Sequence, residues 1–169
     1  MTANSIDTTS ALLDLLAGQQ RRIVGIVAGL DDEAMRRAVL PSGWSCAGMI
    51  QHLTRMTTFW FDAVMSGHQL VDGGDDFELA DDVSVADLVE CYSEATVRGH
   101  DLVRDLPLDT PPAQWPTQLF GPWRLHSLFE VLQHVLVESA THAGHLDAVR
   151  ELIDGGTWNY ELGGVTATE

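Results

Sequence analysis

The sequence predicts an all-α protein, a four-helix bundle whose helices are joined by two long crossover connections. Three observations lead to this fold class. Apolar residues recur every three or four positions over four long stretches, which is the period of an α-helix packed on one face. No stretch alternates polar and apolar residues as a half-buried strand would. Two long connections, one rich in Gly and Asp and one rich in Pro, separate the last three stretches.

The composition is that of a single globular domain over residues 1–169, with the core at about 8–156 and a tail at 157–169. No apolar run reaches the length of a membrane span, and the amino terminus does not resemble a signal peptide, so we expect a cytoplasmic protein. Nine Arg, no Lys and 25 acidic residues give a formal charge of −16, which opposes binding to nucleic acid or anionic membrane. The two cysteines, Cys46 and Cys91, are expected to be buried thiols.

The first helix is predicted over residues 11–30, from a stripe of apolar side chains at helical spacing. The acidic run that begins at Asp31 is typical of the first turn of a short helix, which must end before Pro41. The second long helix is predicted over Ser45–Ser66, with the serine at its start as the N-cap and Gly67 at its end.

The rest of the chain holds two connections, two helices and a tail. Residues 67–83 form a solvated acidic loop without the spacing of a calcium-binding EF-hand. The third helix covers about 84–106, and the connection at 107–123 holds all but one of the six prolines. The fourth helix runs from about Arg124 to Ile153. The tail is expected to be extended or disordered, with its Trp and Tyr docked on the bundle. The inward side chains predicted for the third helix include Leu88, Cys91, Tyr92, Ala95, Leu102 and Leu106.

The inward face of the fourth helix is apolar at both ends and polar in the middle. Its positions advance by alternating steps of four and three: Val131, Val135, Glu138, His142, His145, Val149 and Leu152. The same spacing on the second helix gives Ser45, Met49, His52, Met56, Phe59 and Ala63, again with a histidine in the middle. Burying such polar groups costs folding free energy unless each has a partner, and a metal ion would partner all of them at once.

Glu138 and His142 lie one helical turn apart on one face, and His52 faces them from a matching depth on the second helix. Two imidazoles and one carboxylate leave coordination positions open, as catalytic divalent-metal sites do. Zinc suits this donor set best, with iron, nickel and manganese as alternatives. The spacing leaves three roles open for His145: a fourth ligand, a hydrogen-bonding neighbour, or an acid/base beside the substrate.

The alternative to a metal is a set of hydrogen-bonded core residues, which requires an unusually complete polar network. His134 lies one position off the face and either flanks the pocket or meets solvent. Cys46 points away from the stripe and receives no metal role. Aromatic residues are candidates for the rim of a pocket, and the remaining histidines are expected at the surface. These sets are Trp60, Trp115, Phe120 and Trp123 for the rim, and His68, His100 and His126 for the surface.

Several short motifs resemble the DinB-like superfamily, and more closely its actinobacterial branch that includes the mycothiol-dependent maleylpyruvate isomerases. The motifs are Pro41-Ser-Gly-Trp-Ser45, His52-Leu53 and His134-x3-Glu138-x3-His142-Ala-Gly-His145. The resemblance implies a four-helix bundle with a metal, usually zinc or nickel, held at His52, Glu138 and His142. It also implies a low-molecular-weight thiol such as mycothiol as cofactor or co-substrate. Family members often pair into homodimers.

The resemblance favours a metal-dependent thiol transferase or isomerase that acts on a small electrophile, with His145 or a bound water handling proton transfer. Two alternatives use the same site. The first is a hydrolase with a metal-bound hydroxide, and the second is a non-catalytic stress-response bundle that binds metal or ligand.

Overall fold

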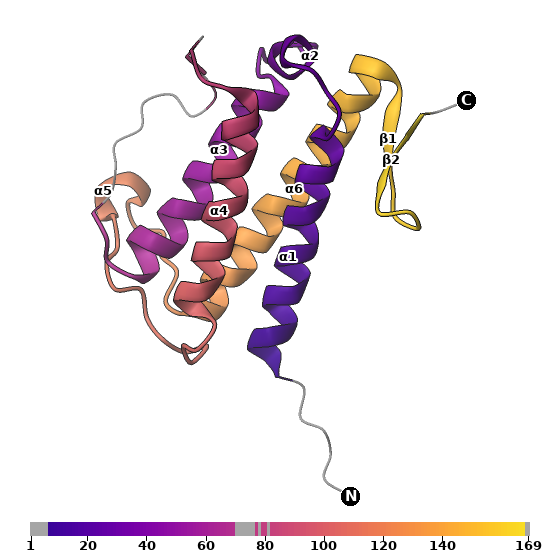
Figure 1. The fold of residues 1–169 in the computed structure, drawn as a ribbon. Helices are drawn as coiled ribbons and strands as arrows, with labels where there is room; N and C mark the ends of the chain where they lie inside the picture. The colour runs from indigo at the N-terminus through magenta and orange to yellow at the C-terminus, as the bar shows by residue number, and fades with distance from the viewer. Residues whose placement is uncertain (1–6, 70–76, 78, 81, 168–169) are drawn as a thin grey trace, which may run out of the picture.

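The computed structural model describes residues 7–69, 77, 79–80 and 82–167, and it confirms the predicted all-α bundle (Figure 1). The long helices lie side by side, and the small elements sit at the ends of the bundle. The elements are α1 (Thr8–Val27), α2 (Asp32–Arg36), α3 (Cys46–Thr58), the π-helix η1 (Phe59–Met65), α4 (Val85–Val103), α5 (Thr117–Phe120), α6 (Leu128–Asp154), β1 (Gly156–Asn159) and β2 (Gly164–Ala167).

The long helices pack as two pairs around one core. Among the long helices, α1 makes its most extensive contacts with α6, and α3 with α4, whereas the contacts of α3 with α6 and of α1 with α4 are fewer. The two pairs therefore meet along two seams, the α3–α6 seam and the α1–α4 seam. Burial of each large apolar side chain contributes about 1.5–3 kcal/mol to the stability of this core. Its fully buried members include Leu16, Ile23, Ile50, Leu53, Leu132, Val135 and Leu146.

Serine side chains start three of the helices. The hydroxyl of Ser45 accepts a hydrogen bond from the backbone N–H of Gly48, and Ser84 caps α4 in the same way, as the sequence predicts. The last helix starts at Leu128 rather than near Arg124. The helix start is fixed by an arrangement similar to a capping box: Ser127 accepts from the N–H of Glu130, and the Glu130 carboxylate accepts from the N–H of His126, one residue before the cap.

The tail is extended, one of the two outcomes predicted for it, and it forms a hairpin of two short strands that no alternating pattern in the sequence indicated. Strands β1 and β2 pair antiparallel, with Trp158 opposite Val165. Trp158 docks on the bundle as expected, because Gly25 of α1 leaves the space: a Cβ there would lie 2.4 Å from the indole ring. Tyr160 is not packed into the bundle: it is 71% exposed, and the guanidinium of Arg22 lies over its ring at 5.0 Å.

Cys46 and Cys91 are both free thiols, but only Cys46 is buried. The inward face of α4 follows Leu88, Tyr92, Ala95, Gly99 and Val103, so Cys91 points outward. The prediction missed this because Gly99 carries no apolar side chain, although it lies directly against Phe61. Among the described residues, no helix is long and apolar enough to cross a membrane.

Candidate metal centre

The structure brings together His52, Glu138 and His142, the three residues that the sequence analysis paired. One potential ligand atom from each lies within 4.8 Å of the others. Nε2 of His142 is 3.4 Å from Oε2 of Glu138, one turn earlier on α6. The His52 ring reaches across from α3 and meets the His142 ring edge-on, with centroids 4.9 Å apart. Metal–ligand bonds are about 2 Å long, so only small side-chain rotations separate this arrangement from a shared coordination sphere.

The three side chains lie at the edge of the α3–α6 seam rather than in the middle of the core. All three are half-buried, while Ser139 and Ala143 take the central positions of α6. The predicted inward face is therefore wrong toward its end, where His145 and Leu152 are exposed. The cause is the period: steps of four and three average 3.5 residues, whereas an α-helix has 3.6 per turn and its buried stripe drifts.

His145 lies beside the three residues and outside their cluster. Its Nδ1 is 3.4 Å from Nδ1 of His142, and its exposed ring has its centroid 6.4 Å from that of Trp44. The side chain is close enough to exchange a proton with a group bound next to His142. Its exposure also keeps it in contact with solvent.

The electrostatics of the cluster favour a neutral His142. Burial lowers the pKa of this imidazole, and a positive charge on His52 would lower it further, while the Glu138 carboxylate works in the opposite direction. A neutral imidazole presents a lone pair, which is the form that binds a metal. By contrast, burial raises the pKa of Cys46 to about 11, so this thiol stays protonated, in agreement with its lack of a predicted metal role.

Residues 11–155 match the family model described as mycothiol-S-transferase. The chain belongs to the mycothiol S-transferase family. This membership confirms the predicted resemblance to the DinB-like superfamily. Searches of curated proteins and of solved structures return no match. The family implies a low-molecular-weight thiol and a small-molecule substrate, so the candidate metal site is part of a mycothiol-related protein.

One neighbour of the site in this mycothiol S-transferase family member was missed by the sequence analysis. Phe77 stacks on His52, with ring centroids 4.6 Å apart and planes inclined by 15°. Its backbone carbonyl approaches Gly48, where a Cβ would lie only 2.4 Å away. Most of the predicted loop at 67–83 lies outside the described residues, but Phe77 belongs to the site. The one feature of the sequence that could have indicated this role is that Phe77 is an aromatic residue within an acidic loop.

An aromatic cluster surrounds His134, one turn before Glu138 on α6. Its ring centroid lies 4.7 Å from that of Trp60 and 5.5 Å from that of Trp123. Trp115 and Phe120 complete the cluster through contacts with the same two tryptophans. His134 is half-buried against these aromatic rings, and burial lowers its pKa while Glu138 opposes that change.

The sequence analysis placed three further histidines at the surface. His68 and His126 are exposed there. His100 is not: it is half-buried and lines a cavity between α1 and α4. The prediction placed His100 at the surface because the apolar pattern of α4 is interrupted at Gly99, which is buried but carries no apolar side chain.

Proposed function

We propose that this protein is a metal-dependent enzyme that joins mycothiol to a small electrophilic molecule. The convergence of His52, Glu138 and His142 on one point is the observation that carries the proposal. Membership of the mycothiol S-transferase family supports it independently.

The donor set fits a divalent ion. Two imidazoles and one carboxylate provide nitrogen and oxygen ligands that zinc accepts, and nickel, iron and manganese accept the same set. Three protein ligands leave room for a further group, as catalytic sites require. When bound, such an ion would hold the sulfur of mycothiol as a thiolate and so supply the nucleophile.

The residues of this chain would position the reactants and move protons. Glu138 lies against Nε2 of His142 and limits the rotation of that ring. Phe77 covers one face of His52 and keeps water from it. We assign His145 as the group that accepts the thiol proton when the thiolate forms, and that returns it to the leaving group or product after the new carbon–sulfur bond has formed.

A titration of cobalt-loaded protein with mycothiol tests the proposal. We expect a sulfur-to-cobalt charge-transfer band that saturates with one thiol per protein. No band at saturating thiol would contradict the thiol function. Hydrolysis of ester or amide probes without thiol would instead indicate a hydrolase that uses the same residues.

A pair of variants tests the site itself. His52→Ala should abolish stoichiometric metal uptake, measured by elemental analysis after dialysis. His126→Ala, an exposed histidine outside the cluster, should leave uptake unchanged. Equal uptake by both variants would show that the metal binds elsewhere.

A third variant separates proton transfer from metal binding. His145→Ala should slow thiol transfer by about 10²-fold or more, since general acid–base groups contribute that much. Metal content should stay unchanged. The rate should also lose one ionisation from its pH profile, which a purely structural role for His145 would not remove.

A further inference from the structure

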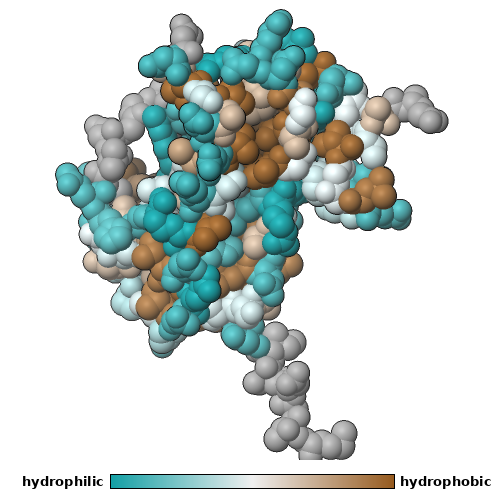
Figure 2. Space-filling view, viewed as in Figure 1, coloured by the Kyte–Doolittle hydropathy of each residue, from teal (hydrophilic) through white to brown (hydrophobic). Residues whose placement is uncertain are grey.

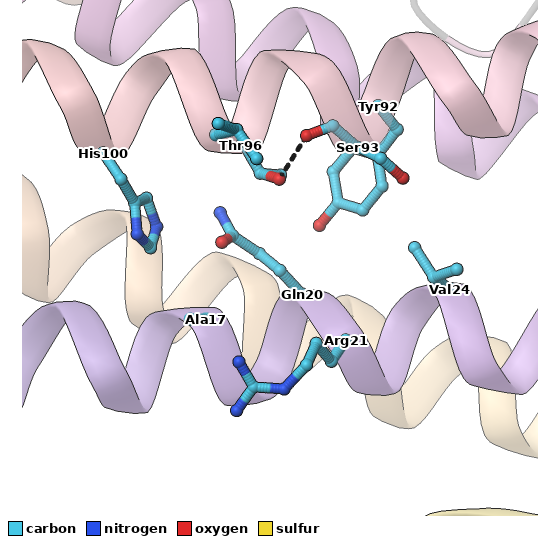
Figure 3. A pocket seen from close by; sticks show the side chains of 9 residues that line it. Ala17, Gln20, Arg21, Val24, Tyr92, Ser93, Thr96 and His100 are labelled. Carbon is cyan, nitrogen blue, oxygen red and sulfur yellow. Dashed lines mark hydrogen bonds between the residues drawn. The ribbon is translucent and has the colours of Figure 1, made fainter.

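A cavity of about 350 Å³ lies between α1 and α4, on the seam opposite the candidate metal centre (Figure 3). Helix α1 lines it with Ala17, Gln20 and Val24, and α4 lines it with Tyr92, Thr96 and His100. None of the metal-site residues takes part. The volume lies within the range of small-molecule sites, which combine apolar walls with a few polar groups.

Three polar groups converge on this cavity without a hydrogen-bond partner among the described residues. They are the amide nitrogen of Gln20, the hydroxyl of Tyr92 and Nε2 of His100, all of them buried atoms. Gln20 is only 5% exposed and Tyr92 is fully buried. Figure 3 shows Gln20 extending from α1 into the gap, and Tyr92 and His100 extending into it from α4. Proteins rarely leave such groups unpaired, because each one loses its hydrogen bonds to water on burial.

The neighbouring hydroxyls do not satisfy these groups in this structure. Ser93 donates to the backbone oxygen of Val89, and Thr96 donates to that of Ser93. Both hydroxyl protons are therefore engaged within α4. Their oxygens keep lone pairs, but neither forms a hydrogen bond with Gln20, Tyr92 or His100, which leaves these groups for a ligand or a buried water.

The convergent groups are uncharged. Burial raises the pKa of Tyr92 above its usual range, so its phenol keeps its proton. Burial and the nearby Arg104 lower the pKa of His100, although Asp101 and Asp14 oppose this. Arg21 also lines the cavity, but Figure 3 shows its side chain turned away from the gap, so no charged group of the lining faces a ligand there, and the net charge of −16 disfavours an anion. An uncharged ligand with hydrogen-bond acceptors fits best.

The apolar part of such a ligand has a place along the same seam. Val24 also lines a second cavity, of about 440 Å³, together with Val27, Leu30, Val85 and Val89. Figure 2 shows apolar surface gathered in the upper part of this face, between α4 and α1. The cavity with the polar groups therefore lies next to an apolar one, and Val24 lines both.

We propose that the α1–α4 cavity is a second binding site, for a small uncharged molecule with an amide or ketone group on an apolar body. Its carbonyl oxygen accepts from Gln20 and Tyr92, and His100 pairs with the same polar end. The site is independent of the proposed thiol chemistry, because no residue is shared.

Fluorine NMR with 4-fluorobenzamide as the probe tests this site. We expect the probe signal to broaden with the wild-type protein and to sharpen again when unlabelled benzamide is added. Tyr92→Phe and Gln20→Leu should each raise the dissociation constant about fivefold or more, the effect of one lost hydrogen bond. Ala17→Leu, which fills the cavity without removing a polar group, should abolish binding.

Two matched controls make the result specific. Tyr160→Phe removes a phenol hydroxyl from the exposed hairpin, and His68→Ala removes an exposed imidazole outside both sites; both should bind the probe as wild type does. Circular dichroism melting establishes that each variant is folded. No broadening at millimolar probe, or equal affinity in wild type, Tyr92→Phe and Ala17→Leu, would overturn the proposal and leave buried water as the partner of these groups.

Discussion

Glu138 differs from the two histidines of the candidate site in both charge and exposure. Its side chain is 36% exposed, against 14% for His142. As a carboxylate it brings a negative charge to a cluster that otherwise contains two imidazoles. It would offset part of the charge of a divalent ion, which neutral imidazoles cannot do.

Replacing Glu138 by Gln keeps the shape of the side chain and removes its charge. We expect affinity for zinc to fall by at least about tenfold, measured by competition with a chromogenic chelator. Glu151→Gln is the matched control, because Glu151 is an exposed glutamate of the same helix. Unchanged affinity in Glu138→Gln would remove this residue from the ligand set.

Stability should depend on pH through three histidines. Burial is the largest cause of the lowered pKa values of His100, His134 and His142. In the unfolded chain an imidazole titrates at about pH 6.5, so below that pH the unfolded chain binds protons that the folded protein does not. The free energy of unfolding of the metal-free protein should therefore fall between about pH 7 and pH 5.

Urea unfolding at several pH values measures how the free energy of unfolding changes with pH. His100→Gln should flatten this dependence, whereas His68→Gln, at an exposed position, should not. The lowered pKa of Asp154, caused mainly by Arg150, acts at lower pH, around and below the usual carboxyl value of 3.8. If the free energy of unfolding changed with pH equally in wild type and His100→Gln, His100 would not contribute to the pH dependence of stability.

At the residue scale, the sequence predicted the cluster but not its surroundings. His52, Glu138 and His142 could be paired because their spacing along each helix is local information. Phe77 and His100 could not be placed, since one lies in a loop and the other depends on contacts between α1 and α4.

At the scale of single elements, the change from α3 to η1 has the largest effect on side-chain placement. The backbone switches from α-helical to π-helical hydrogen bonding at Phe59, which alters the direction of every side chain that follows. Trp60 of η1 consequently packs on His134 of α6. One continuous helix over Ser45–Ser66 was predicted, because apolar spacing carries no signal for a single widened turn.

The contact of η1 with α4 depends on a missing side chain. A Cβ on Gly99 would lie 2.5 Å from the ring of Phe61, which is fully buried. We expect Gly99→Ala to lower the free energy of unfolding by about 1–3 kcal/mol, despite the better helix propensity of Ala. Chemical denaturation measures this difference.

Gly144→Ala on α6 is the control with the opposite sign. Nothing lies within 4 Å of a Cβ at this helical position. The substitution should stabilise the protein by up to about 1 kcal/mol through helix propensity alone. If both variants were equally stable, the close approach of Phe61 to α4 would be wrong.

At the scale of the whole molecule, Arg150 ties α6 to the end of α1. This buried side chain donates to the backbone oxygens of Ile26 and Ala28, and to the carboxylate of Asp154. The hairpin packs over the same region through Trp158, whose backbone N–H donates to the carboxylate of Asp147. Periodicity predicted the bundle but not this arrangement, because it rests on hydrogen bonds between segments that are distant in sequence.

Arg150→Met should reduce the free energy of unfolding by about 2–4 kcal/mol, since it leaves two carbonyl oxygens of α1 without their donor. Arg104→Met provides the comparison. That arginine is exposed and pairs with Asp101, so its loss should cost no more than about 1 kcal/mol. Thermal melting of both variants measures the difference, and equal melting temperatures would contradict a structural role for Arg150.

The two seams of the bundle connect the same two helix pairs from opposite sides. His52 belongs to the α3–α4 pair, and Glu138 and His142 belong to the α1–α6 pair; the cavity between α1 and α4 spans the pairs at the other seam. Occupancy of either seam would constrain how the pairs sit against each other. Thermodynamic reciprocity then demands that any factor by which a cavity ligand changes metal affinity equals the factor by which the metal changes ligand affinity.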